Sequence, residues 1–97
     1  MDKRDQVLAV IYAAVDELNE LQPLEGRLEK TPEAVLFGRA AKIDSLGLVN
    51  LLVATEQRLN DAFGVALTLA DEKAMSQRNS PFRSVGSLAD YIVTLLP

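Results

Sequence analysis

The chain of 97 residues contains no cysteine and no histidine. These two absences exclude a cysteine nucleophile, a Ser-His-Asp triad, a disulfide and any thiolate or imidazole metal site. We therefore expect no catalytic residues and no metal, and the chain is not expected to be an enzyme. Any thiol chemistry would have to be supplied by a group attached to the protein.

Long apolar runs and clustered basic residues are also missing. No segment approaches the roughly 20 consecutive apolar residues of a membrane-spanning helix, and Met1-Asp2-Lys3-Arg4-Asp5 has no apolar signal region. The ten Lys and Arg residues are scattered and give, with fourteen acids, a net charge of -4. These features predict a cytoplasmic protein with no membrane span that does not bind nucleic acid.

What the sequence does contain is typical of one small globular domain. Apolar residues make up 48% and charged residues 25% of the chain. We expect a single domain over residues 1–97, without internal repeats, and a monomer.

The N-terminal segment predicts an amphipathic helix from about Asp2 to Leu21, ended by Pro23 and Gly26. Its apolar residues recur at three- and four-residue steps and form one stripe. They are Val7, Leu8, Ile11, Tyr12, Val15, Leu18 and Leu21.

A long connection follows and leads to Asp44. Within it, Thr31-Pro32-Glu33 predicts the start of one short helical turn that continues through Leu36 and ends at Gly38. We expect three apolar side chains to anchor the connection to the core, namely Leu28, Leu36 and Phe37.

A second main helix is predicted from Ser45 to Phe63, with Gly64 as its C-terminal cap. Six of the eight residues from Leu46 to Val53 are apolar, which is more than one core-facing stripe requires. Part of this helix should therefore contact something other than the core. We assign Leu51, Leu52 and Leu59 to the core and Leu46, Val49 and Val53 to another side.

The C-terminal third predicts an extended connection, a short helix and a final helix. Val65, Leu67 and Leu69 should help to close the core, and Asp71–Met75 should form one or two helical turns. Ser84 should cap a helix from Val85 to about Leu96. The predicted fold class is all-α, a small up-down bundle of three main helices plus a short helix.

The start of the second main helix is the position of greatest chemical interest. Asp44 and Ser45 are both strong helix-start residues, and Asp-Ser before an apolar run is most often an ordinary cap. A phosphate attached to the Ser45 hydroxyl would also lie at the positive end of the helix dipole, near backbone N–H groups. Residue chemistry alone leaves both interpretations open.

Asp44-Ser45-Leu46 resembles the attachment motif of acyl and peptidyl carrier proteins, and the helix order resembles that family over nearly the whole chain. The resemblance implies a four-helix bundle, 4'-phosphopantetheine bound covalently to Ser45, and a role for Asp44 in transferase recognition. It also implies partners: a phosphopantetheinyl transferase, an acyl- or aminoacyl-loading ligase and downstream acyl-processing enzymes. One departure concerns the glycine that this family commonly has shortly before the aspartate. In this chain the nearest preceding glycine is Gly38.

Further site residues follow from the resemblance and the helix pattern. Partner contacts are predicted at Leu46, Val49, Asn50, Val53 and Glu56, on a helix with fewer acids than the family commonly has. Leu67 and Met75 would line a cargo pocket if the bundle shelters a cargo chain.

Three alternatives remain beside an acyl carrier. A peptidyl or aminoacyl carrier would share the arm and differ in cargo. A plain helical protein-interaction domain would use Asp44-Ser45 only as a cap. A hydrolase with paired carboxylates, such as Asp16 and Glu20, is disfavoured because acids at that spacing usually form a solvated helix surface.

Overall fold

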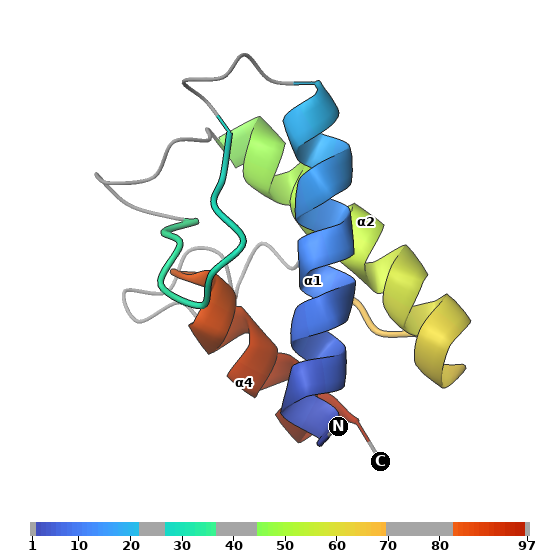
Figure 1. Ribbon diagram of the computed structural model, residues 1–97. Coiled ribbons are helices and arrows are strands. Elements are labelled where there is room, and N and C mark those ends of the chain that lie inside the picture. Colours follow the sequence, from blue (N-terminus) through green and yellow to red (C-terminus); the bar gives the residue numbers. More distant parts are fainter. Residues whose placement is uncertain (1, 22–26, 37–44, 70–82, 97) are drawn as a thin grey trace.

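A computed structural model describes residues 2–21, 27–36, 45–69 and 83–96. This part of the chain contains three α-helices and no β-sheet: α1 (Lys3–Glu20), α2 (Ser45–Phe63) and α4 (Val85–Leu95). The helices form a small bundle (Figure 1). The predicted short helix at Asp71–Met75 lies outside the described residues, as do Phe37 and Gly38.

Helix α1 packs against both of the other helices. In Figure 1 it runs upward from the N-terminus, whereas α2 and α4 run in the opposite general direction. This arrangement agrees with the predicted up-down order of the helices.

The predicted apolar stripe of α1 forms a large part of the core. Six α1 residues are buried, namely Val7, Leu8, Ile11, Ala14, Val15 and Leu18. Tyr12 is half-buried. Leu21, predicted to lie in the stripe, is instead 80% exposed, because the helix ends at Glu20 and Leu21 is its C-cap residue.

Helix α2 runs from Ser45 to Phe63, as predicted. Leu51, Leu52 and Leu59 are fully buried, which confirms their assignment to the core. Gly64 has a φ of 67° and donates its N–H to the Asn60 carbonyl at 2.9 Å. This left-handed conformation strongly favours glycine, so Gly64 ends the helix as expected.

The extended segment after Gly64 closes one side of the core. Leu69 is fully buried, and Val65 and Leu67 are half-buried and packed against the core. The alternating burial of this segment confirms that these three residues help to close the core.

Helix α4 starts with a capping box. The Ser84 hydroxyl accepts the Ser87 N–H at 3.1 Å, and the Ser87 hydroxyl accepts the Ser84 N–H at 3.0 Å. These reciprocal bonds satisfy backbone donors that a helix start leaves without helical acceptors. The apolar side chains of α4 that enter the core are Val85, Leu88, Ala89 and Ile92.

The connection between α1 and α2 is anchored by two leucines, as predicted: Leu28 and Leu36 are buried. Asn19, near the end of α1, holds this segment through both ends of its amide. Its Nδ2 donates to the Leu28 carbonyl at 3.0 Å, and its Oδ1 accepts the Leu28 N–H at 2.8 Å. The Asn19 amide thus pairs with the backbone of Leu28 much as a neighbouring strand would.

The prediction of a helical turn that continues through Leu36 is wrong beyond the first residues of that turn. The Ala34 N–H donates to the Thr31 carbonyl at 3.1 Å and closes a tight turn, but Val35 then pairs antiparallel with Ser84. The Leu36 N–H donates to the Arg83 carbonyl at 2.7 Å. These partners lie far along the chain, so the segment obtains its hydrogen bonds from the start of α4 and stays extended.

At the same end of the bundle, a side-chain bond joins α1 to α4. Arg4 donates to an Asp90 carboxylate oxygen at 2.8 Å, and this bond raises the pKa of Arg4. The Gly86 N–H donates to the Pro32 carbonyl at 2.8 Å, and a Cβ on Gly86 would lie only 3.0 Å from that oxygen. Glycine therefore lets the 31–36 turn lie directly against the first turn of α4.

We expect Asn19→Ala to lower the free energy of unfolding by about 2 kcal/mol, because it leaves the partly buried N–H and C=O of Leu28 without their partner. Asn50→Ala is the matched control, since Asn50 is exposed on α2 and the change in helix propensity is the same. Urea unfolding of both variants measures the difference. Equal stabilities would show that the Asn19–Leu28 pairing contributes nothing.

Candidate functional site

The candidate site is the start of α2, which begins at Ser45 as predicted. The positive end of the α2 dipole therefore lies at the residue that would carry a phosphate. Asp44 lies outside the described residues. The described neighbours of Ser45 differ sharply in burial, since Leu46 is 69% exposed and Leu48 is buried.

An uncharged surface extends from Leu46 along the outer side of α2. We call it the neutral face, and its exposed members are Leu46, Asn50, Val53, Gln57 and Asn60. The fourteen steps between its ends correspond to about 21 Å of helix. Val53 is 40% exposed, while Val49, predicted to lie beside it, is half-buried.

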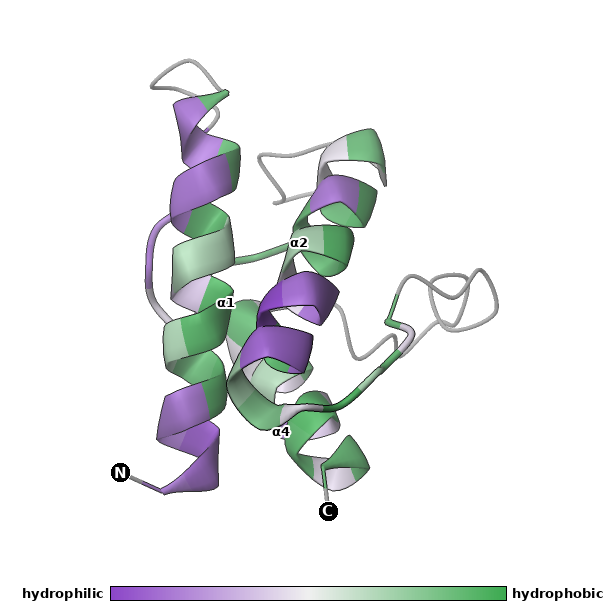
Figure 2. Ribbon diagram, turned by 90° about the vertical axis from the view of Figure 1, so that its right-hand side faces the viewer, coloured by the Kyte–Doolittle hydropathy of each residue, from purple (hydrophilic) through white to green (hydrophobic). Residues whose placement is uncertain are grey.

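The exposed side of α1 provides a contrast, because it carries Asp5, Asp16, Glu17 and Glu20. In Figure 2 the first turn of α2 is coloured white and green, without the purple that marks hydrophilic residues along much of α1. The sequence prediction that part of α2 faces away from the core is therefore correct for Leu46 and Val53. These two are among the large apolar residues most exposed in the described part of the chain.

Glu56, predicted as a partner contact, has a structural role. Its carboxylate accepts the backbone N–H of Leu69, thirteen residues later. This bond holds the extended segment 65–69 against α2. Leu67, predicted to line a cargo pocket, lies half-buried in that segment, and Met75 lies outside the described residues.

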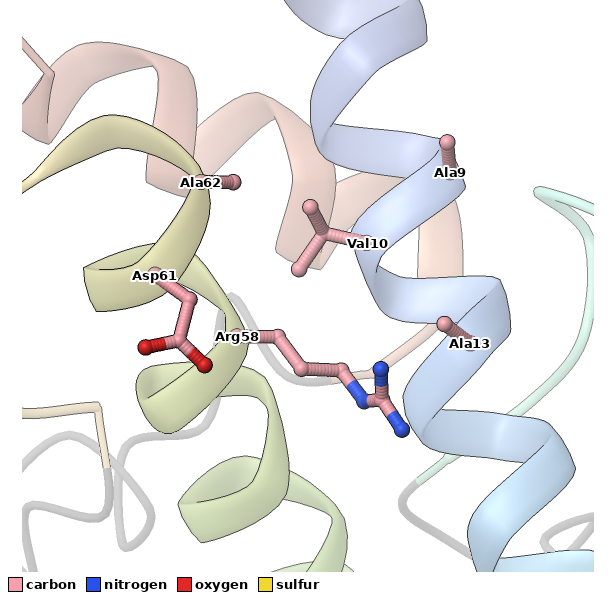
Figure 3. A pocket seen from close by; sticks show the side chains of 6 residues that line it. All are labelled: Ala9, Val10, Ala13, Arg58, Asp61 and Ala62. Atoms are coloured by element: carbon pink, nitrogen blue, oxygen red, sulfur yellow. The ribbon is translucent and has the colours of Figure 1, made fainter.

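Two hollows that were not predicted lie between α1 and α2. The larger, of about 350 Å³, is lined by Ala9, Val10, Ala13, Arg58, Asp61 and Ala62 (Figure 3). The smaller, of about 160 Å³, is lined by Ala14, Glu17, Leu18, Leu21, Asn50 and Ala54. Small residues recur along both helices, but only the packing of α1 on α2 brings them together.

No family model, curated protein or solved structure matches this chain.

The described ranges offer little for metal or membrane chemistry. They contain no group of three or more Asp or Glu side chains placed to hold a metal ion. Among these residues, no helix has the length and apolar character needed to cross a membrane.

The Glu56–Leu69 bond predicts a local change that does not require unfolding of the bundle. We expect Glu56→Ala to speed hydrogen exchange of the Leu69 amide about tenfold, because a hydrogen bond to a charged group contributes roughly 1.5–3 kcal/mol. Glu56→Gln is the control, since its side-chain oxygen can still accept the bond. Unchanged exchange in Glu56→Ala, measured by NMR, would contradict this role.

Proposed function

We propose that the chain is an acyl carrier protein that holds an acyl or aminoacyl group as a thioester on 4'-phosphopantetheine attached to Ser45. The observation that carries the proposal is that α2 begins at Ser45, with the exposed neutral face directly after it. The all-helical bundle supports it, with the order long helix, connection, long helix and final helix. The short helix at Asp71–Met75 and a four-helix carrier fold are part of the proposal.

The attachment reaction is a phosphoryl transfer. The Ser45 oxygen forms a bond to the β-phosphorus of coenzyme A, the pyrophosphate linkage breaks, and adenosine 3',5'-bisphosphate leaves while the serine proton is lost. The product phosphate would lie at the start of α2, where the helix dipole favours negative charge. The arm ends in a thiol, which this cysteine-free chain cannot otherwise supply. Asp44 would be recognised by the transferase.

The chain itself would catalyse nothing in this function. Its arm would present the group to a loading ligase and to downstream acyl-processing enzymes, and tethering would raise the local concentration of the group at each of them. If the bundle shelters the cargo, Leu67 and Met75 would line the pocket. We place this work in the cytoplasm and expect the carrier to act as a monomer.

A helical protein-interaction domain is the second candidate. The exposure of Leu46 and Val53 favours it, because exposed apolar side chains on one helix face mark a protein contact. In that case Ser45 would only begin the helix and would carry no group.

We expect the chain to gain the mass of one phosphopantetheine after incubation with coenzyme A, Mg²⁺ and a phosphopantetheinyl transferase. Ser45→Ala should abolish the gain. Ser84→Ala is the matched control, because it removes another helix-start serine and should cost about 1 kcal/mol of stability without affecting loading. Intact-mass spectrometry that shows no gain, or a gain in Ser45→Ala, would exclude the carrier function.

We expect Val53→Asp to slow loading by the transferase five- to tenfold. The substitution loses about 1 kcal/mol of apolar burial and forces a carboxylate into the contact. Leu95→Asp is the matched control, since Leu95 on α4 is 38% exposed and Val53 is 40% exposed.

Salt provides a second readout of the same contact. At about 0.5 M salt the Debye length falls to about 4 Å, so a contact made by the neutral face should weaken little. If Val53→Asp leaves the rate of loading unchanged while salt strongly slows loading, charge steering governs recognition instead.

A further inference from the structure

The neutral face combines apolar and amide side chains in a regular order along α2. From the start of the helix its exposed members are Leu46, Asn50, Val53, Gln57 and Asn60. An apolar side chain is thus followed by an amide twice in succession, at steps of three or four residues. None of these side chains carries a charge. The face therefore alternates apolar contact with groups that form hydrogen bonds.

Two of the three amides are open to a ligand. Asn60 is engaged, because its Nδ2 donates to the Val65 carbonyl at 3.1 Å. By contrast, no described residue forms a hydrogen bond with the side chain of Asn50 or Gln57. An amide side chain has both an acceptor and donors. Asn50 and Gln57 can therefore each pair with an amide of a group that lies along the face.

The arm in the proposed function has the length of this part of the face. About thirteen covalent bonds separate its phosphorus from its sulfur, and an extended peptide covers about 3.4 Å with every three bonds, so the arm reaches about 15 Å. Along α2, Val53 lies about 12 Å and Gln57 about 18 Å from Ser45. An extended arm would therefore end between these two residues. Asn60, about 22 Å from Ser45, lies beyond its reach.

The order of groups along the arm also matches the order on the face. After the phosphate, the arm has a carbon with two methyl groups, an amide, a pair of methylenes, a second amide and a further pair of methylenes before the thiol. Side chains of a helix lean toward its N-terminus, so Leu46 would contact the methyl groups, Asn50 the first amide and Val53 the methylenes. Gln57 has the longest side chain of the face and would reach back to the second amide.

We propose that the neutral face holds the phosphopantetheine arm in an extended conformation, as far as Gln57, between encounters with partner enzymes. The inference rests on the proposed function, in which the arm is attached to Ser45. Leu46 and Val53 cover the apolar parts of the arm, and Asn50 and Gln57 bind its amides. A partner that contacts the neutral face displaces the arm, so docking itself releases the thiol for reaction.

The described interior of the bundle fits the arm less well. On the core side of α2, Leu51 and Leu52 are fully buried, and the buried Thr55 hydroxyl donates to the Leu51 carbonyl at 2.8 Å. Leu69 is also fully buried, and Glu56 holds its backbone N–H. An arm that entered here would displace side chains that the core already packs, whereas the neutral face is open.

The test compares the full chain before and after loading. A phosphopantetheinyl transferase attaches the arm from coenzyme A, and intact-mass spectrometry verifies complete loading. We expect changes in the backbone amide shifts of Asn50, Val53 and Gln57, in addition to those of the residues next to Ser45.

A nitroxide on the thiol of coenzyme A locates the end of the arm. Line broadening by the nitroxide should be at least fivefold stronger at Gln57 than at Leu46. An arm that moves freely about Ser45 would give the opposite order, because its end would spend more time near the start of α2.

Substitutions test the contact itself. Val53→Asp places a carboxylate in the middle of the contact and should reduce the shift changes at Asn50 and Gln57 at least threefold in the fully loaded protein. Leu95→Asp is the matched control on α4, where Leu95 is similarly exposed, and should leave these changes unaltered. Gln57→Ala removes an exposed amide without adding charge and should reduce the nitroxide effect near Val53 at least twofold. Circular dichroism verifies that the variants remain folded.

Several results would overturn this inference and leave the carrier function intact. They are shift changes confined to the residues next to Ser45, nitroxide broadening strongest at Leu46, and equal effects of Val53→Asp and Leu95→Asp. Shift changes at Leu67 and Leu69 without changes on the neutral face would place the arm against the segment 65–69 and would also overturn it. A chain that gains no mass excludes the carrier function, and the inference with it.

Discussion

Burial of the apolar stripe of α1 is the interaction on which the rest of the structure depends. Because α1 packs against both α2 and α4, its buried side chains contribute to the two main helix contacts of the core. Each fully buried Val, Leu or Ile side chain contributes about 1.5–3 kcal/mol, which offsets the conformational entropy lost when the helices are ordered. Without α1, the other two helices would share few contacts.

The connections are held by a second kind of interaction, in which polar groups on the helices bind the backbone of the linking segments. Asn19 pairs with Leu28, and the carboxylate of Glu56 accepts the N–H of Leu69. Each bond positions a leucine that the core buries. The extended segments are therefore fixed by a small number of polar contacts together with one or two apolar anchors.

Helix α2 presents different chemistry on its different sides. One side supplies the core, the neutral face is exposed after the predicted attachment serine, and a third side lines the two hollows between α1 and α2.

The sequence alone determined the approximate bounds of the three described helices, the Ser84 cap of α4 and the Gly64 end of α2. Apolar spacing, the Ser84 cap and Gly64 are local signals, since a helix forms its hydrogen bonds within a few residues and its ends require particular backbone conformations. The same spacing placed Leu51, Leu52 and Leu59 in the core. The motif at Asp44-Ser45 likewise indicated a chemical role that the shape of the bundle alone would not suggest.

Tertiary structure decided what depends on partners far along the chain. Val35 is extended because it pairs with Ser84, although Thr31-Pro32-Glu33 favours a helical turn. Leu21 is exposed because α1 ends at Glu20 and Leu21 is its C-cap residue. The Glu56 carboxylate accepts the backbone N–H of Leu69. The two hollows between α1 and α2 exist only where small residues of the two helices meet. Periodicity within one helix carries no information about which residues of another helix will face it.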